Sequence, residues 1–122
     1  MHPLRAAASA IVPELCAACG RPCRPEAVVC TRCARRLARA EPLHGKGPPG
    51  LDRAWSSAPY EDVARQLVAA LKFRRLLPVA SLMAERIHRL APGHLLGGAV
   101  VAVPAAPPRR RRRGVDPAGG LA

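Results

Sequence analysis

The sequence predicts two parts in succession, a small ribbon-like module rich in cysteine and an incomplete α/β domain. Three observations lead to this prediction. Two CxxC pairs lie near the N-terminus, a segment dense in proline and glycine follows them, and apolar residues at helical spacing begin after that segment. A chain of 122 residues is long enough for one average domain, or for one small module and part of another.

The two CxxC pairs have the spacing of a metal site. Cys16 and Cys19 form the first pair, and the second pair follows after ten residues. Each pair places two sulfurs on one side of a tight turn, and Gly20 permits the positive φ that such a turn favours. Two facing turns offer four thiolates in a tetrahedral arrangement, which suits Zn²⁺. We therefore expect residues 13–40 to form a zinc ribbon with the ligands Cys16, Cys19, Cys30 and Cys33.

Other uses of the cysteines were weighed against zinc. A thioredoxin-like redox pair would follow a strand and begin a helix, and disulfides would need an oxidising compartment, which nothing in the sequence indicates. Cys23 makes the number of cysteines odd, so it is either a free thiol or a replacement for Cys19. His44 is a further competitor, and we expect both to be non-ligands. Because four protein sulfurs leave no open position, the zinc would be structural rather than catalytic.

The chain is strongly basic, with 20 Lys and Arg against 8 Asp and Glu and a formal net charge of +12. This charge suits DNA or another nucleic acid, a phosphorylated small molecule or an acidic partner. A bias in codon composition would produce the same excess of arginine without any binding function. The aromatic residues are only Trp55, Tyr60 and Phe73, so the chain has little on which single-stranded bases could stack.

The clearest domain boundary is PLHGKGPPG at residues 42–50, where three prolines and three glycines break regular structure. We interpret it as a linker. It separates an N-terminal helix and zinc ribbon at residues 1–41, with the helix within residues 1–12, from the α/β region at residues 51–122.

Apolar spacing predicts the elements of the second region. It favours a strand over residues 53–58 and helices over residues 60–73 and 79–90, the first opened by Pro59. Residues 99–103, AVVAV, are apolar without alternation, as in a strand buried on both faces of a parallel sheet.

A further helix start follows, with Asp116 as N-cap and Pro117 in the first turn. The sequence continues for only five residues beyond Pro117. A doubly buried strand needs neighbours that this sequence does not supply, so we expect a truncated chain or the front half of a larger enzyme.

No segment reads as a membrane or export signal. Residues 3–15 are short and interrupted by charge and proline, and residues 95–106 are too short to cross a bilayer. With this cysteine usage we expect a cytoplasmic protein without membrane insertion.

In this order the motifs resemble those of the ComF family of phosphoribosyltransferase-like proteins. The matching pieces extend over essentially the whole chain: VPELCAACGRPC, CTRCARRL, WSSAPYED, VAALKFRR, VVAVPAAP and RRRRRGVDPAGGLA. The resemblance implies a type I phosphoribosyltransferase-like domain behind a zinc ribbon. It also implies an association with DNA uptake in competence, and a protein partner in that machinery.

The resemblance further implies a phosphate-binding loop after the first buried strand, which in such folds helps to hold the pyrophosphate of phosphoribosyl pyrophosphate. On this chain the loop is the segment that follows Val103 and Pro104 and runs to Gly114, and guanidinium forks suit phosphate oxygens. The residues assigned to phosphate are Arg109, Arg112, Arg113 and Gly114. A solvated basic loop is the alternative for this run.

The family's acidic-pair, Thr/Gly-rich loop grips the ribose 5-phosphate and bears the Mg²⁺-associated acids, and no such run occurs in this sequence. We therefore expect Mg²⁺ and phosphoribosyl pyrophosphate to act only in a complete parent protein, with no catalytic residue here and no transfer by this chain alone. Two other functions stay open. One is a zinc-ribbon module that binds nucleic acid or a partner protein through its basic flanks, and the other is a remnant without activity.

Overall fold

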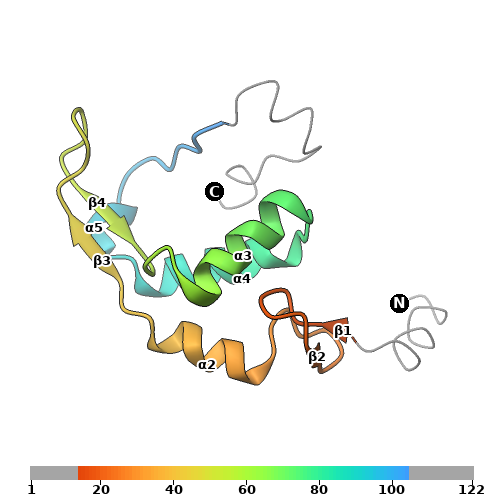
Figure 1. Cartoon of the computed structure of the whole chain (residues 1–122). Coiled ribbons are helices and arrows are strands. Elements are labelled where there is room, and N and C mark those ends of the chain that lie inside the picture. The colour runs from red at the N-terminus through yellow and green to blue at the C-terminus, as the bar shows by residue number, and fades with distance from the viewer. Residues whose placement is uncertain (1–13, 105–122) are drawn as a thin grey trace.

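The computed structural model describes residues 14–104. In chain order these form β1 (Glu14–Leu15), β2 (Pro22–Cys23), α2 (Thr31–Arg39), β3 (Leu43–Gly45), β4 (Ala54–Ser56), α3 (Asp62–Phe73), α4 (Pro78–Leu90) and α5 (Gly93–Leu96) (Figure 1). The expected N-terminal helix, the arginine run and the helix start at Asp116 lie outside the described residues.

The helix α3 forms where apolar periodicity predicts it. Its buried side chains recur at helical spacing, at Val63, Leu67, Ala70 and Leu71, so one face points to the core. The predicted start is wrong by two residues, because the chain first makes a turn in which the Glu61 N–H donates to the Pro59 carbonyl over 2.9 Å. Pro59 therefore lies before the helix instead of in its first turn.

The helix α4 begins with Pro78 in its first turn, where the missing N–H costs no helical hydrogen bond. Its span agrees with the predicted helix over residues 79–90. The connection from α3 is short, so the two helices pack against each other as a helical pair. A turn in which the Leu76 N–H donates back to the Ala70 carbonyl closes the end of α3.

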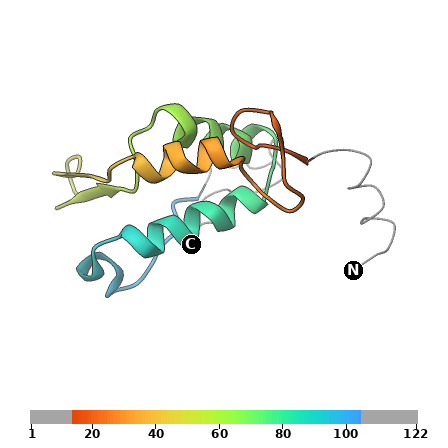
Figure 2. The ribbon, with the colours of Figure 1, turned by 90° about the horizontal axis from the view of Figure 1, so that it is seen from below.

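The order in space places the helices between two small hairpins. The β3–β4 hairpin and the cysteine-rich loops around β1 and β2 lie at opposite ends of α2, in both views (Figures 1 and 2). The helix α3 contacts both α2 and α4. Each sheet is a two-stranded antiparallel pair, β1 with β2 and β3 with β4.

One hydrophobic cluster joins the N-terminal module to the helical pair. Cys16, Ala17 and Cys33 contribute to it from the module, and α3 and α4 contribute most of the rest. The fully buried side chains of largest volume are Leu67, Val79 and Cys16. The core therefore contains residues from both sides of the segment 42–50.

The prediction that residues 42–50 lack regular structure is wrong. Within this segment β3 pairs with β4, with His44 opposite Trp55 in the register. The prolines lie on either side of the strand instead of inside it, at positions 42, 48 and 49, and Gly50 takes a φ of +93° in the loop. The predicted strand over residues 53–58 is confirmed in its centre as β4.

The predicted buried strand at residues 99–103 is also wrong. The segment forms no strand, and its valines are exposed, Val101 to 82%. A doubly buried strand needs a partner on each side, whereas all four strands in the described part of the chain pair in hairpins. Within residues 14–104 no parallel pair forms, so this part of the chain does not show the predicted α/β sheet. None of its helices is long and apolar enough to cross a membrane.

Candidate metal centre

The first pair of cysteines lies in a turn that the sequence builds locally. Cys16 directly follows β1, and its backbone N–H donates to the Arg21 carbonyl over 2.8 Å. The Gly20 N–H donates back to the Cys16 carbonyl over 2.9 Å. Gly20 has a φ of +73°, a conformation that an L side chain adopts only with strain. This turn brings Cys16 and Cys19 to one side of the chain.

The second pair uses the start of α2. Cys30 is the N-cap residue of this helix, and its sulfur accepts a hydrogen bond from the Cys33 N–H over 3.5 Å. Cys33 lies in the first turn and is buried. Because the first backbone N–H groups of a helix have no partner within it, this position favours a thiolate.

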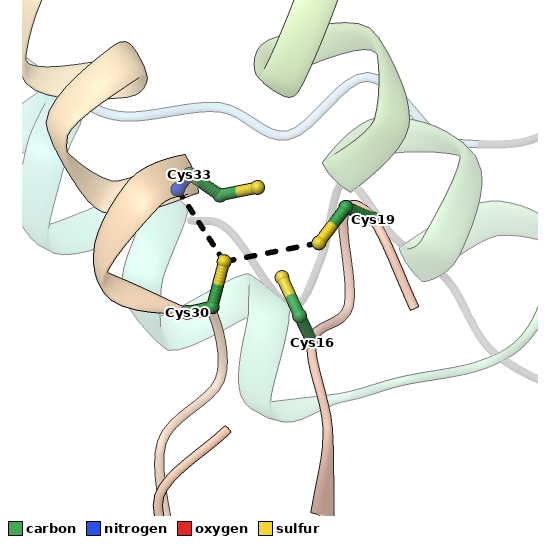
Figure 3. A group of neighbouring side chains, drawn as sticks. All are labelled: Cys16, Cys19, Cys30 and Cys33. Carbon is green, nitrogen blue, oxygen red and sulfur yellow. Dashed lines mark hydrogen bonds between the residues drawn. The ribbon is translucent and has the colours of Figure 1, made fainter. Parts of the chain in front are cut away.

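The two pairs meet at one point. The four sulfur atoms of Cys16, Cys19, Cys30 and Cys33 all lie within 4.8 Å of one another, and the side chains converge (Figure 3). The Cys19 and Cys30 sulfurs are 3.8 Å apart. A tetrahedral zinc ion with Zn–S bonds of ~2.3 Å separates its sulfur ligands by about 3.8 Å. The four residues predicted as ligands thus lie together at metal-binding distances.

The thiols of the cluster differ in how readily they ionise. Burial opposes ionisation of Cys16, but backbone N–H groups that include those of Cys19 and Cys30 outweigh it and lower its pKa to about 6. The Cys33 N–H lowers the pKa of Cys30. Burial strongly raises the pKa of Cys33. Ionisation is therefore easiest at Cys16 and hardest at Cys33, and a bound cation would displace the proton of Cys33.

The two alternative ligands lie apart from the cluster. The thiol of Cys23 donates instead to the Ala27 carbonyl over 3.4 Å, and burial raises its pKa. His44 lies exposed on β3, in the hairpin at the other end of α2 (Figure 1). Neither residue belongs to the group of four.

Contacts from the helical pair hold the cysteine loops in place. A guanidinium N–H of Arg74, at the end of α3, donates to the Ala17 carbonyl between the first two cysteines. Arg36 on α2 pairs with Asp62 at the start of α3 over 2.8 Å. The loop of the first cysteine pair is therefore bonded to α3 through Arg74. The helix α2, which carries the second pair, is bonded to α3 through Arg36.

Arg86 is a structural residue that sequence reasoning missed. It is 7% exposed, and its Nη2 donates to the carbonyls of Ala40 over 2.8 Å and Ser57 over 2.9 Å. Burial, and then the nearby Arg89, lowers its pKa. One side chain of α4 thus joins the end of α2 to the segment after β4. The sequence did carry a signal, because position 86 falls within the apolar stripe of α4.

The residues assigned to phosphate lie outside the described residues, so their prediction stays untested. Comparison of the chain with protein-family models, with curated proteins and with solved structures gives no match.

Proposed function

We propose that residues 14–40 bind one zinc ion in a structural centre formed by the four clustered cysteines. The observation that supports this most strongly is the convergence of four sulfurs to within 4.8 Å of one another. Thiolate is a soft ligand, and a tetrahedral arrangement of four sulfurs is typical of zinc or of iron–sulfur centres. The CxxC pairs with a helix N-cap at the second pair favour zinc.

The role of this zinc is to hold the fold together. All four ligands come from the protein, so no position remains for a substrate or for an activated water. Cys16 and Cys33 are buried within the cluster that also contains Leu67 and Val79, so the metal would lie against the core of the helical pair. Metal binding and folding of the module are then coupled.

Elemental analysis of the purified chain tests the zinc site. We expect one zinc per chain, loss of that zinc in the variants Cys16→Ser and Cys33→Ser, and retention in the matched control Cys23→Ser. Cobalt substitution should give the absorption of a tetrahedral thiolate site. Full zinc content in the Cys16→Ser variant, or iron in place of zinc, would contradict the proposal.

We further propose that the chain is a ComF-like, phosphoribosyltransferase-like protein. The order of its motifs supports this, because WSSAPYED, VAALKFRR and the Arg-run–Gly element follow the two CxxC pairs as in that family. In that setting Arg109, Arg112, Arg113 and Gly114 would bind phosphate. Mg²⁺ and phosphoribosyl pyrophosphate would require the family's acidic-pair, Thr/Gly-rich loop, which these 122 residues do not contain.

Calorimetric titration with pyrophosphate tests this second proposal. Replacement of residues 109–113 by serine should remove salt-sensitive binding, because the guanidinium groups supply the charge that phosphate needs. Equal affinity in the variant and the unmodified chain at low salt would contradict it. Replacement of five cations elsewhere by glutamine provides the control for net charge, at Lys46, Arg53, Arg65, Lys72 and Arg89.

A further inference from the structure

Six exposed arginines line a continuous basic surface beside the cysteine cluster, and the proposed zinc site does not use them. Four lie on α2, and two flank β2. They are Arg21, Arg24, Arg32, Arg35, Arg36 and Arg39. We call this surface the arginine groove.

The groove consists of two hollows that adjoin. One has a volume of about 680 Å³, and Arg21, Arg24 and Arg32 contribute to its lining. The other has a volume of about 440 Å³ and is lined by the arginines of α2 together with Thr31. Thr31 and Arg32 line both hollows, so the surface continues from β2 along α2.

The arginines of α2 lie on one face of the helix. Arg32, Arg35, Arg36 and Arg39 recur at spacings of three and four residues, which places them side by side, while Cys33 and Leu37 turn toward the core. Like charges at these spacings repel and destabilise a helix. An anion that lies across them would remove this repulsion.

Within the described part of the chain, these six arginines take part in one ion pair. No acidic side chain lines either hollow. The ion pair of the groove is that of Arg36 with Asp62, both of whose side chains are about half exposed. The other five arginines are exposed, and only Arg39 also lines a hollow that contains acidic residues, Glu41, Glu61 and Asp62.

We infer that the arginine groove binds the phosphate backbone of double-stranded nucleic acid without regard to sequence. Arg32 and Arg39 lie about 10 Å apart along the helix axis, at 1.5 Å per residue. The row of arginines is therefore long enough to contact more than one phosphate of a strand. Guanidinium groups form paired hydrogen bonds with carboxylate and phosphate oxygens alike, but a duplex carries one negative charge per ~1.7 Å of its axis, and this dense, regular charge favours it over an acidic protein.

The lining of the groove also favours a duplex over a single strand. Proteins that bind single strands stack the bases on aromatic side chains. Neither hollow has an aromatic residue in its lining. The inference goes beyond the proposed zinc centre and depends on it only for the position of β2 against α2.

Fluorescence anisotropy with a short, labelled DNA duplex of mixed sequence tests the inference on the full chain. The variant carries Arg32→Gln, Arg35→Gln and Arg39→Gln, which keep good helix propensity and leave the Arg36–Asp62 pair intact. Each phosphate contact contributes about 0.9 to the slope of log affinity against log salt. We expect the triple variant to flatten this slope by about 2.7 and to weaken binding at least ~10-fold at 50 mM salt.

The matched control removes three positive charges outside the groove, with Lys46→Gln, Arg65→Gln and Arg89→Gln. It should leave the salt slope nearly unchanged. Equal losses in the two triple variants would overturn the inference, because binding would then follow net charge or the arginine run at residues 109–113. Equal binding of polyglutamate and duplex would overturn it as well, in favour of an acidic protein partner.

Zinc content and circular dichroism of every variant separate this inference from the proposed zinc site. A groove variant that keeps its zinc and fold but loses duplex binding supports the groove directly. If the purified chain holds no zinc but still binds duplex through the groove, the zinc proposal is contradicted and the groove inference stands. A single-stranded probe that binds as tightly as the duplex would overturn the choice of a duplex.

Discussion

The cysteine-rich module at residues 14–40 and the helical pair α3–α4 are held by different interactions. The helical pair buries branched aliphatic side chains, among them Val63, Leu67 and Val79. The buried residues of the module are Cys16, Ala17 and Cys33, all of them small, and its larger side chains Val28, Val29 and Leu37 are only partly buried. Burial of so little apolar surface, at about 25 cal/mol per Å², cannot offset the ordering of this many residues. The comparison indicates that the module needs the metal proposed for its four cysteines, whereas packing holds the helical pair.

The two regions are nevertheless in contact. They share one hydrophobic cluster, and the Arg74–Ala17 hydrogen bond and the Arg36–Asp62 pair cross between them. The question is therefore how far the loss of one region spreads to the other.

Removal of the metal should have the largest effect. Structural zinc supplies an apparent ~10–16 kcal/mol in small zinc modules, so chelation should unfold residues 14–40. Hydrogen exchange would then show loss of protection in α2 with partial protection left in α3 and α4. Equal loss of protection in all three helices would show that the module and the helical pair form one cooperative unit.

Truncation of the helical core should come next. Leu67 is 1% exposed, so Leu67→Ala should destabilise the fold by about 2–5 kcal/mol through lost burial and the cavity that remains. Denaturant unfolding in the presence of zinc measures this loss. If the folded variant still holds one zinc per chain, the module keeps its metal independently of how well the helical pair is packed. If the variant loses zinc without unfolding, the module depends on that packing as well.

Removal of the buried guanidinium should have an intermediate effect. Arg86→Met keeps the apolar stem but leaves the carbonyls of Ala40 and Ser57 without their donor, which should cost about 1–3 kcal/mol. Chemical denaturation gives this value, and Arg89→Met, on the exposed face of α4, is the control. If Arg86→Met lowers the free energy of unfolding no more than Arg89→Met does, water replaces both hydrogen bonds to the Ala40 and Ser57 carbonyls.

The exposed ion pair between the regions should matter least. Arg36 and Asp62 are about half exposed, so Asp62→Asn should cost less than about 1 kcal/mol, and less still at high salt. Thermal unfolding at low and high salt measures this dependence. A loss above 1 kcal/mol that persists in high salt would show that this pair is a principal connection between module and helices.

The sequence predicted those features whose contacts are local. Cys16 and Cys19 lie in one turn with Gly20, and Cys30 and Cys33 lie in one helical turn, so spacing alone indicated how each pair is arranged. The spans of α3 and α4 followed from their apolar periodicity. These features need few neighbours from elsewhere in the chain.

Features that depend on distant partners were missed. Arg86 is buried because two carbonyls 46 and 29 residues away accept its hydrogen bonds. The strand β3 exists because β4 pairs with it, despite the prolines and glycines around it. The arginine groove likewise arises from the position of β2 beside α2, which composition alone does not reveal.

The exposed segment at residues 99–103 has a practical consequence for handling the protein. These five consecutive residues are uncharged, and three of them are valines, which have high β-propensity. All three valines are exposed and belong to no strand. Such a run recruits identical runs from other molecules through backbone pairing. We expect concentrated samples to aggregate through these residues, and a lysine at position 101, on the most exposed valine, to raise the attainable concentration.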